Sequence, residues 1–276
     1  MTDAGKPAGL ATAYEGLEDA TAFPDAASVD SYRRLLLERT AMQADFLMRR
    51  IPAHARLLEV ACGNGRLLIE LARRHAIGAG LGFDLARSRI AFAKRWAADE
   101  GCDTLEFAAA DALACELPPQ TFSAVAVITG AFGYFEPAAS GSGNLLAARL
   151  YEALEQGGVL CFEIYPHPGH RRLLAVTGGK ARIWSELSAD DPWRFYLSDL
   201  ALDESGEILT HEKTFIHRAS GRVDAGRVER LYLYTTERLQ ELLAAASFRD
   251  VRFYEGWSEE PYQGGEIMVV TAAKAQ

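Results

Sequence analysis

The chain has 276 residues, of which 49% are hydrophobic and 24% are charged, and its formal net charge is -9. A chain of this size can form one large globular α/β domain whose core needs no disulfide or metal ion to hold it together. An acidic surface repels phosphate backbones, so we expect no nucleic-acid partner.

The four cysteines show no zinc-binding pattern, because none is spaced as Cys-x-x-Cys and no histidine lies at zinc-finger spacing from them. The N-terminal segment lacks the basic and apolar regions of a signal peptide, and no apolar run reaches the length of a membrane span. We therefore expect a cytoplasmic protein with no metal site and no membrane partner.

Small residues, mostly Gly and Ala, dominate positions 1 to about 13, which we expect to be frayed. From residue 28 to about 50, apolar residues recur at helical spacing, with Ser28 and Asp30 as candidate N-caps. Strands and helices alternate after Pro52, and this rhythm is typical of βαβ units in a parallel sheet. The expected strands are 56–61, 79–84, 105–109, 122–128 and 159–165, the helices are 67–72, 87–100 and 144–155, and a turn at Gly157-Gly158 precedes the fifth strand.

The pattern changes at Pro166, where short alternating runs predict antiparallel strands. These strands are 194–197, 207–211 and 230–234, with turns at Ser205-Gly206 and Ser220-Gly221. The earlier rhythm then resumes with a helix over 237–246, capped by Thr235 or Thr236, and strands over 249–255 and 266–272.

We predict a doubly wound, Rossmann-like α/β fold. Its seven-stranded sheet is mostly parallel with one antiparallel strand, and an antiparallel β insertion follows strand five. The parts of this single domain are an N-terminal arm and lid helix (1–50), the α/β core (51–165 and 235–276) and a β insertion on the substrate side (166–234).

The most specific motif is the glycine turn that follows the first strand, in residues 57–65 (LLEVACGNG). Such a turn lets the backbone approach a ligand at the carboxyl edge of the sheet. A dinucleotide fingerprint needs three glycines as G-x-G-x-x-G, and neither the frame from Ala61 nor the frame from Gly63 supplies them. A carboxylate at Glu59 suits a cationic ligand better than a pyrophosphate.

Two aspartates follow the next two strands. Asp84 lies 19 residues after Gly65 and can accept from both hydroxyls of a ribose, although it could also be a helix cap. Asp111 can accept from an adenine amino group while Ala112 offers its N–H to the ring, although Asp111 could also be a turn residue.

These motifs together resemble the class I S-adenosylmethionine-dependent methyltransferases. EVACGNG is similar to the first motif, GFDLARSRIAFAKR to the ribose segment, AAADAL to the adenine segment, FSAVAVITGAFGYF to the fourth motif and LEQGGVLCFEI to the turn into strand five. The resemblance implies that Leu85 and Arg89 flank the ribose, that Ile128 and Thr129 lie near the sulfonium, and that Tyr14 closes over the donor. The implied S-adenosylmethionine-binding residues are Tyr14, Glu59, Ala61, Cys62, Gly63, Gly65, Asp84, Leu85, Arg89, Asp111, Ala112, Ile128 and Thr129.

Catalytic residues are harder to predict, because the donor is already activated and a base is needed only if the acceptor must lose a proton. Tyr134 is the first candidate for contact with the acceptor, as base or hydrogen-bond partner. In some amino-sugar N-methyltransferases a histidine matches Tyr134, and Tyr134 could instead only pack with Phe132 and Phe135. His167, in a loop rich in Pro and Gly, is the second candidate, with a surface histidine as the alternative.

We expect an enzyme that methylates an oxygen or nitrogen of a small molecule, such as those of secondary metabolism. A nucleic-acid or protein methyltransferase and a non-catalytic binding protein on this fold are the alternatives. Enzymes that methylate exocyclic amines of nucleic acids usually carry Asn/Asp-Pro-Pro-aromatic after strand four, where this chain has Thr129-Gly130-Ala131-Phe132. The acceptor, the atom methylated, the use of a base and the oligomeric state stay open.

Overall fold

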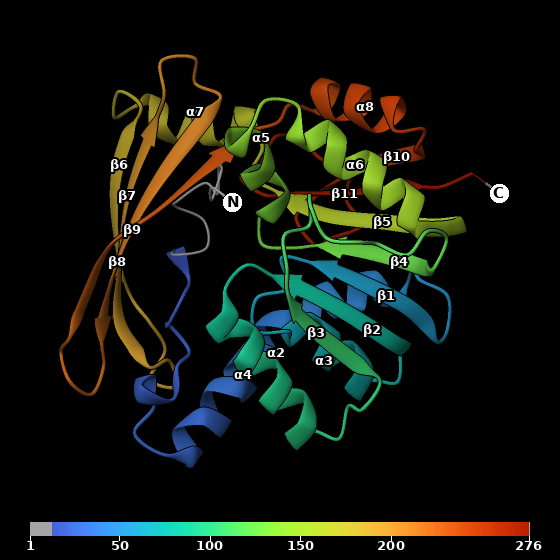
Figure 1. The fold of residues 1–276 in the computed structure, drawn as a ribbon. Coiled ribbons are helices and arrows are strands. Elements are labelled where there is room, and N and C mark those ends of the chain that lie inside the picture. Colours follow the sequence, from blue (N-terminus) through green and yellow to red (C-terminus); the bar gives the residue numbers. More distant parts are fainter. Residues whose placement is uncertain (1–12, 276) are drawn as a thin grey trace, which may run out of the picture.

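The computed structural model describes residues 13–275 and contains two β-sheets (Figure 1). The glycine- and alanine-rich residues 1–12, which we predicted to be frayed, lie outside the described residues. The main sheet has seven strands in the order β10-β11-β5-β4-β1-β2-β3, and a second sheet has four in the order β6-β7-β8-β9.

The main sheet has the predicted mixture of strand directions. Strand β11 runs antiparallel to both of its neighbours, β5 and β10, whereas the other pairs are parallel. The fold class is therefore confirmed. The strands are β1 (Ala55–Val60), β2 (Ile77–Asp84), β3 (Leu105–Ala109), β4 (Phe122–Val127), β5 (Leu154–Ile164), β10 (Arg249–Glu255) and β11 (Met268–Ala273).

Helices cover both faces of the main sheet, and the alternation of side chains along each strand divides the core between them. Leu57 belongs to the cluster under α2 (Ala26–Met48), α3 (Arg66–Arg73) and α4 (Arg87–Asp99). Its neighbour Leu58 belongs to the cluster under α6 (Ser142–Ala153) and α8 (Thr236–Ala245). Every residue of β4 is buried, as expected of a central strand covered on both faces. Within the described residues, no helix is long and apolar enough to cross a membrane.

The second sheet is the predicted insertion, but it has four strands instead of three. They are β6 (Lys180–Glu186), β7 (Trp193–Leu202), β8 (Ile208–His217) and β9 (Val223–Tyr232), all antiparallel. The prediction missed β6, whose residues are mostly exposed and show no apolar alternation.

The segment between β5 and β6 forms the helix α7 (His167–Ala175), where we expected a loop rich in Pro and Gly. Pro166 is the N-cap and Pro168 lies in the first turn, where a helix needs no backbone N–H as donor. Strand β5 also begins earlier than expected, at Leu154. The predicted turn at Gly157-Gly158 is an irregular part of this strand, in which Gly157 has φ 75° and donates its N–H to the Lys274 carbonyl.

Helix α2 begins at Ala26, and its N-cap is Asp25, so the predicted caps Ser28 and Asp30 were wrong. The Asp25 carboxylate accepts from the Ser28 backbone N–H at 2.8 Å and from the Ser28 hydroxyl at 2.7 Å. Ser28 is therefore a partner of the cap and not the cap itself. The other cap prediction, Thr235 or Thr236, is confirmed, since Thr235 caps α8.

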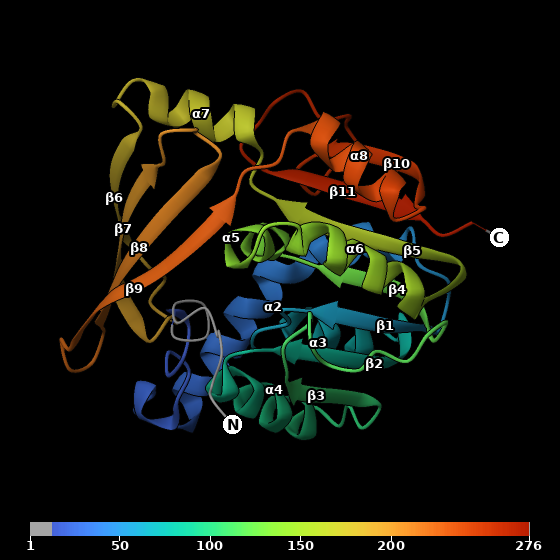
Figure 2. The same cartoon turned by 45° about the horizontal axis from the view of Figure 1, so that its top comes forward.

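The insertion sheet stands beside the carboxyl ends of the main sheet, as Figure 2 shows most clearly. Residues 13–25, which we call the arm, pass between the two sheets. They bond to the insertion sheet, where the Trp193 indole of β7 donates to the Leu17 carbonyl, and to a helix that covers the main sheet, where the Gly16 N–H donates to the Ser88 hydroxyl of α4. The carboxyl edge of the main sheet is thus enclosed by the arm and the insertion sheet.

The Thr235 cap of α8 can be tested through the stability of the protein. Thr235→Ala removes the hydroxyl that accepts from the Arg238 N–H at 3.2 Å, so we expect the free energy of unfolding to fall by about 1 kcal/mol. The control is Thr236→Ala, because that hydroxyl contacts only the exposed Glu237 carboxylate. Urea unfolding of both variants makes the measurement, and equal losses would contradict the assignment of the cap.

Candidate active site

The turn between β1 and α3 brings backbone close to neighbouring side chains. Ala61, Gly63 and Gly65 all have positive φ, at 56°, 54° and 75°. A Cβ on Gly63 would lie 2.6 Å from Cζ of Arg89, and a Cβ on Gly65 would lie 2.6 Å from the Phe107 ring. The turn therefore requires glycine for both its conformation and its closeness to neighbours.

Glu59, the last but one residue of β1, is the most unusual group of the turn. Its side chain is fully buried, and among the described residues neither carboxylate oxygen has a hydrogen-bond partner. Burial raises the pKa of Glu59 to about 8, against the attraction of Arg66. A buried polar group without a partner is costly, so it marks a place where a ligand or water completes the site.

Asp84 joins the end of β2 to the glycine turn. One carboxylate oxygen accepts from the Gly63 N–H at 2.8 Å, and the other accepts from the Ala86 N–H at 2.8 Å. A carboxylate offers about four lone-pair positions, so two remain for ligand hydroxyls. The N-cap of α4 is Ala86, with no side-chain cap hydrogen bond, so Asp84 is not a helix cap and keeps lone pairs that can bind a ligand.

The other predicted binding residues lie along the same edge. Asp111 is exposed and accepts from the Leu113 N–H at 2.9 Å, while Ala112 is buried. Ile128 and Thr129 follow β4, and Thr129 has a positive φ of 61° although it is not glycine. Because β4, β1, β2 and β3 are adjacent, the ends of these strands form one continuous edge.

An arm residue that the sequence did not reveal holds the glycine turn. Glu18 is 3% exposed and accepts from the Tyr32 hydroxyl at 2.9 Å, the Asn64 side-chain amide at 2.6 Å and Nε of Arg89 at 3.0 Å. The guanidinium of Arg89 also lies over the Tyr14 ring, 5.2 Å from its centroid. The partners of Glu18 come from three separate segments of the chain, so no local motif could have identified this residue.

Tyr134, the first catalytic candidate, lies in the short 3₁₀ helix η2 (Ala131–Tyr134) after β4. Its hydroxyl donates to Oε2 of Glu229 at 2.8 Å, and the Tyr14 hydroxyl donates to the same oxygen at 2.7 Å. The two hydroxyl oxygens are 3.3 Å apart. The predicted arm tyrosine and the predicted acceptor tyrosine are thus brought together by a carboxylate of β9.

Burial and the charge of Glu229 raise the pKa of both Tyr14 and Tyr134 well above the usual value for tyrosine. Each therefore keeps its proton at neutral pH, which favours a hydrogen-bonding role for Tyr134 over a role as base. Tyr134 also packs in the hydrophobic core, so both alternatives left open by the sequence describe part of its environment.

The other oxygen of Glu229 binds two residues of β8. Nζ of Lys213 lies 2.5 Å from Oε1, and Nδ1 of His211 lies 3.0 Å from it. Burial alone would raise the pKa of Glu229, but the hydrogen bonds and charges of His211 and Lys213 lower it to about 2. His211 and Lys213 are two residues apart in a strand and so share a face, which is the one signal that could have singled them out.

His167 starts α7, where its backbone N–H donates to the Tyr234 carbonyl at 3.0 Å. Among the described residues, no hydrogen bond links its side chain to Tyr134 or Glu229. The ring of His170, one turn later in α7, packs against the Tyr165 ring, with 5.2 Å between the ring centroids. No group of three or more His, Cys, Asp or Glu residues in the described chain could hold a metal ion.

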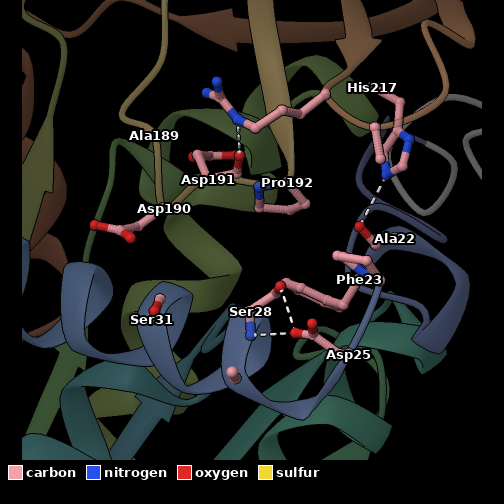
Figure 3. A pocket seen from close by; sticks show the side chains of 14 residues that line it. Ala22, Phe23, Asp25, Ser28, Ser31, Ala189, Asp190, Asp191, Pro192 and His217 are labelled. Atoms are coloured by element: carbon pink, nitrogen blue, oxygen red, sulfur yellow. Dashed lines mark hydrogen bonds between the residues drawn. The ribbon is translucent and has the colours of Figure 1, made fainter.

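A cavity of about 260 Å³ opens elsewhere, between the start of α2, the arm and residues 189–192 (Figure 3). Figure 3 shows His217 at one side of it, where Nε2 lies 2.8 Å from the Ala22 carbonyl oxygen. Neither Glu59 nor Tyr134 lines this cavity, so it is separate from the site at the strand ends.

Comparison with known proteins agrees with the motifs. Residues 57–158 match the family model described as a methyltransferase domain. No curated protein is significantly similar in sequence.

Solved structures share the fold over nearly the whole chain. A methyltransferase from Streptomyces caelestis has a TM-score of 0.70 at 17% identity, covering 85% of this chain and 89% of its own. An S-adenosylmethionine-dependent methyltransferase from Clostridium acetobutylicum has a TM-score of 0.68 at 15% identity, with coverages of 90% and 92%. An amino pentose methyltransferase from Micromonospora echinaspora, solved with S-adenosylmethionine bound, has a TM-score of 0.61 at 22% identity, with coverages of 90% and 97%. At these identities the likeness establishes the fold.

The buried Glu59 carboxyl predicts a measurable pH dependence of stability. Because its pKa rises from 4.5 to about 8 on folding, the folded protein binds the proton more tightly, and stability falls as pH rises through this range. Glu59→Gln should flatten that decline, by up to about 5 kcal/mol between pH 4.5 and 8. Denaturant unfolding at several pH values measures it, and parallel curves for the variant and the unchanged protein would contradict it.

Proposed function

Since the protein carries a methyltransferase domain whose cofactor is S-adenosylmethionine, we propose that it transfers the methyl group to an oxygen or nitrogen of a small molecule. The observation that carries this proposal is the convergence of Tyr14 and Tyr134 on Glu229 at the carboxyl edge of the sheet. There the arm and the insertion sheet lie against the strand ends.

The residues of the edge fit this cofactor. A cationic ligand would favour the ionised form of the unpartnered Glu59 carboxyl, and the glycine turn provides a surface without side chains. Asp84 has lone pairs to spare for the two ribose hydroxyls, and Asp111 with Ala112 would hold the adenine. Ile128 and Thr129, at the end of β4, would lie beside the sulfonium.

The acceptor side has the chemistry of a site that orients a small polar molecule. When bound, S-adenosylmethionine supplies a methyl group on a positively charged sulfur, which needs no further activation. The protein must then align the acceptor and exclude water. Tyr14 and Tyr134 both direct their protons at Glu229, and the Tyr14 oxygen already accepts from the Lys213 ammonium. The Tyr134 oxygen can therefore accept a hydrogen bond from an O–H or N–H of the acceptor.

The class of acceptor follows from the enclosure and from charge. A net charge of -9 opposes a nucleic acid, and the loop after β4 carries Thr129-Gly130-Ala131-Phe132 in place of the motif typical of enzymes that act on exocyclic amines. The similarity in fold to an amino pentose methyltransferase makes sugars with free hydroxyl or amino groups the first acceptors to test.

Donor binding at the glycine turn is tested by Gly63→Ala. The new Cβ would meet the guanidinium of Arg89 and fill the face of the turn, so we expect affinity for S-adenosylhomocysteine to fall at least about tenfold, or ~1.4 kcal/mol. The matched control is Gly101→Ala, which has a similar φ of 66° but no atom within 4 Å of the new Cβ. Titration calorimetry compares them. Equal affinity in the two variants would remove the turn from the donor site.

Methyl transfer itself is tested by a screen of amino and neutral sugars and of phenols, with release of S-adenosylhomocysteine as the readout. With an acceptor in hand, Tyr134→Phe should lower kcat/KM by about 10- to 100-fold, because one hydrogen bond that orients the acceptor is lost. Tyr151→Phe is the matched control, since that ring packs on Phe248 at the far side of the core. Donor binding without turnover of any acceptor would contradict the proposed function.

A further inference from the structure

Five polar side chains gather on the face of the insertion sheet that is turned toward the main sheet. They are Tyr196 and Ser198 of β7, His211 and Lys213 of β8, and Glu229 of β9. His211 stands directly opposite Glu229 in the ladder between β8 and β9. A buried ion pair such as Lys213 with Glu229 is no more stabilising than well-packed apolar residues, so the fold alone does not require these charges.

The partners of His211 determine which ring nitrogen carries the proton. Nδ1 lies 3.0 Å from Oε1 of Glu229, and an ionised carboxylate can only accept a hydrogen bond. Nδ1 is therefore protonated, and Nε2 has a free lone pair in the neutral ring. The Tyr196 hydroxyl lies 2.7 Å from Nε2 and donates to it, and Ser198 also contacts this nitrogen.

Among His211, Lys213 and Glu229, His211 has the most accessible side chain. Its side chain is 15% exposed, whereas Lys213 is 7% and Glu229 is 2% exposed. Glu229 connects it to the predicted acceptor site, because the same carboxylate binds Tyr14 and Tyr134 through its second oxygen.

Polar groups of β7, β8, β9 and α7 face His211. Glu229 is the anion beside the ring, and Lys213 and the nearby His170 are the neighbours that can carry a positive charge. The groups that face His211 are Tyr196, Ser198, Lys213, Glu229 and His170.

We propose that His211 takes up the proton that the methyl acceptor loses, with the Tyr196 hydroxyl as relay and Glu229 as positioning residue. This inference rests on the proposed function. The acceptor lone pair forms the new bond to the methyl carbon, and the bond from that carbon to sulfur breaks with its electrons left on sulfur. The acceptor proton passes to the Tyr196 oxygen while the Tyr196 proton passes to Nε2 of His211, from which it leaves to solvent.

The relay restricts the class of acceptor. It serves a nucleophile that carries a proton to be lost, which means a hydroxyl group or an amine with an N–H. A tertiary amine or a thioether has no such proton and would gain nothing from His211. We therefore expect the substrate to be an alcohol, a phenol, or a primary or secondary amine.

The first test measures kcat/KM against pH with an acceptor from the screen. His211→Gln should lower kcat/KM by about 10²- to 10⁴-fold and abolish the fall in rate on the acid side, while S-adenosylhomocysteine affinity stays unchanged. Tyr196→Phe should lower it similarly, because the relay oxygen is gone. The control is His75→Asn, which lies after α3 at a positive φ of 54° that asparagine tolerates.

Glu229 needs a paired variant, because Glu229→Gln alone would leave the Lys213 ammonium buried without its counter-charge. Glu229→Gln combined with Lys213→Met removes both charges. If Glu229 positions His211, this double variant should shift the acid side of the profile of kcat/KM against pH. A full rate and an unchanged pH profile in His211→Gln would overturn the proposal.

A second measurement needs no acceptor. In the protein with S-adenosylhomocysteine and ¹⁵N-labelled histidine, NMR should show the His211 ring protonated at Nδ1 alone at neutral pH, with His211→Gln assigning the signal. A ring protonated at Nε2 alone would refute the relay even if methyl transfer occurs. Failure to bind the donor would instead contradict the proposed function, so the two failures are distinguishable.

Discussion

The Glu229 carboxylate is the interaction on which the enclosed site depends, because it joins three parts of the chain that are distant in sequence. It accepts from Tyr14 of the arm, from Tyr134 after β4 and from His211 and Lys213 of the insertion. A carboxylate that is 2% exposed is stable only because these donors replace the water it has lost. The same bonds fix where the hydroxyl oxygens of both tyrosines face.

A second buried carboxylate, Glu18, joins the arm to the donor side of the site, as Glu229 joins the arm to the acceptor side. It ties the arm to Asn64 of the glycine turn and to Arg89 of α4. The arm therefore touches both halves of the site, with Tyr14 and Glu18 only four residues apart. Any movement of the arm would change the donor and acceptor surfaces together, which suits a reaction that requires alignment and the exclusion of water.

The parallel core could be predicted because its signals are local, and the residues proposed for donor binding were chosen from local signals of the same kind. The alternation of strands and helices predicted a mostly parallel sheet, and Glu59 and Asp84 stood out because each lies at the end of a short apolar strand. The acceptor side could not be predicted in the same way. Glu18, His211 and Glu229 are placed in the site by partners from other segments, which no local pattern shows. The helix α7 was missed because its prolines, usually a sign of a loop, lie in the first turn, where a helix tolerates them.

The central claim is that donor and acceptor meet at the carboxyl edge of the main sheet, beneath the arm. A crystal structure with S-adenosylhomocysteine bound tests it most directly. We expect the ribose on Asp84, the backbone of the glycine turn against the amino-acid end, and the sulfur directed toward Tyr134 and Glu229. Binding in the cavity beside His217, or a sulfur directed away from Tyr134, would contradict it.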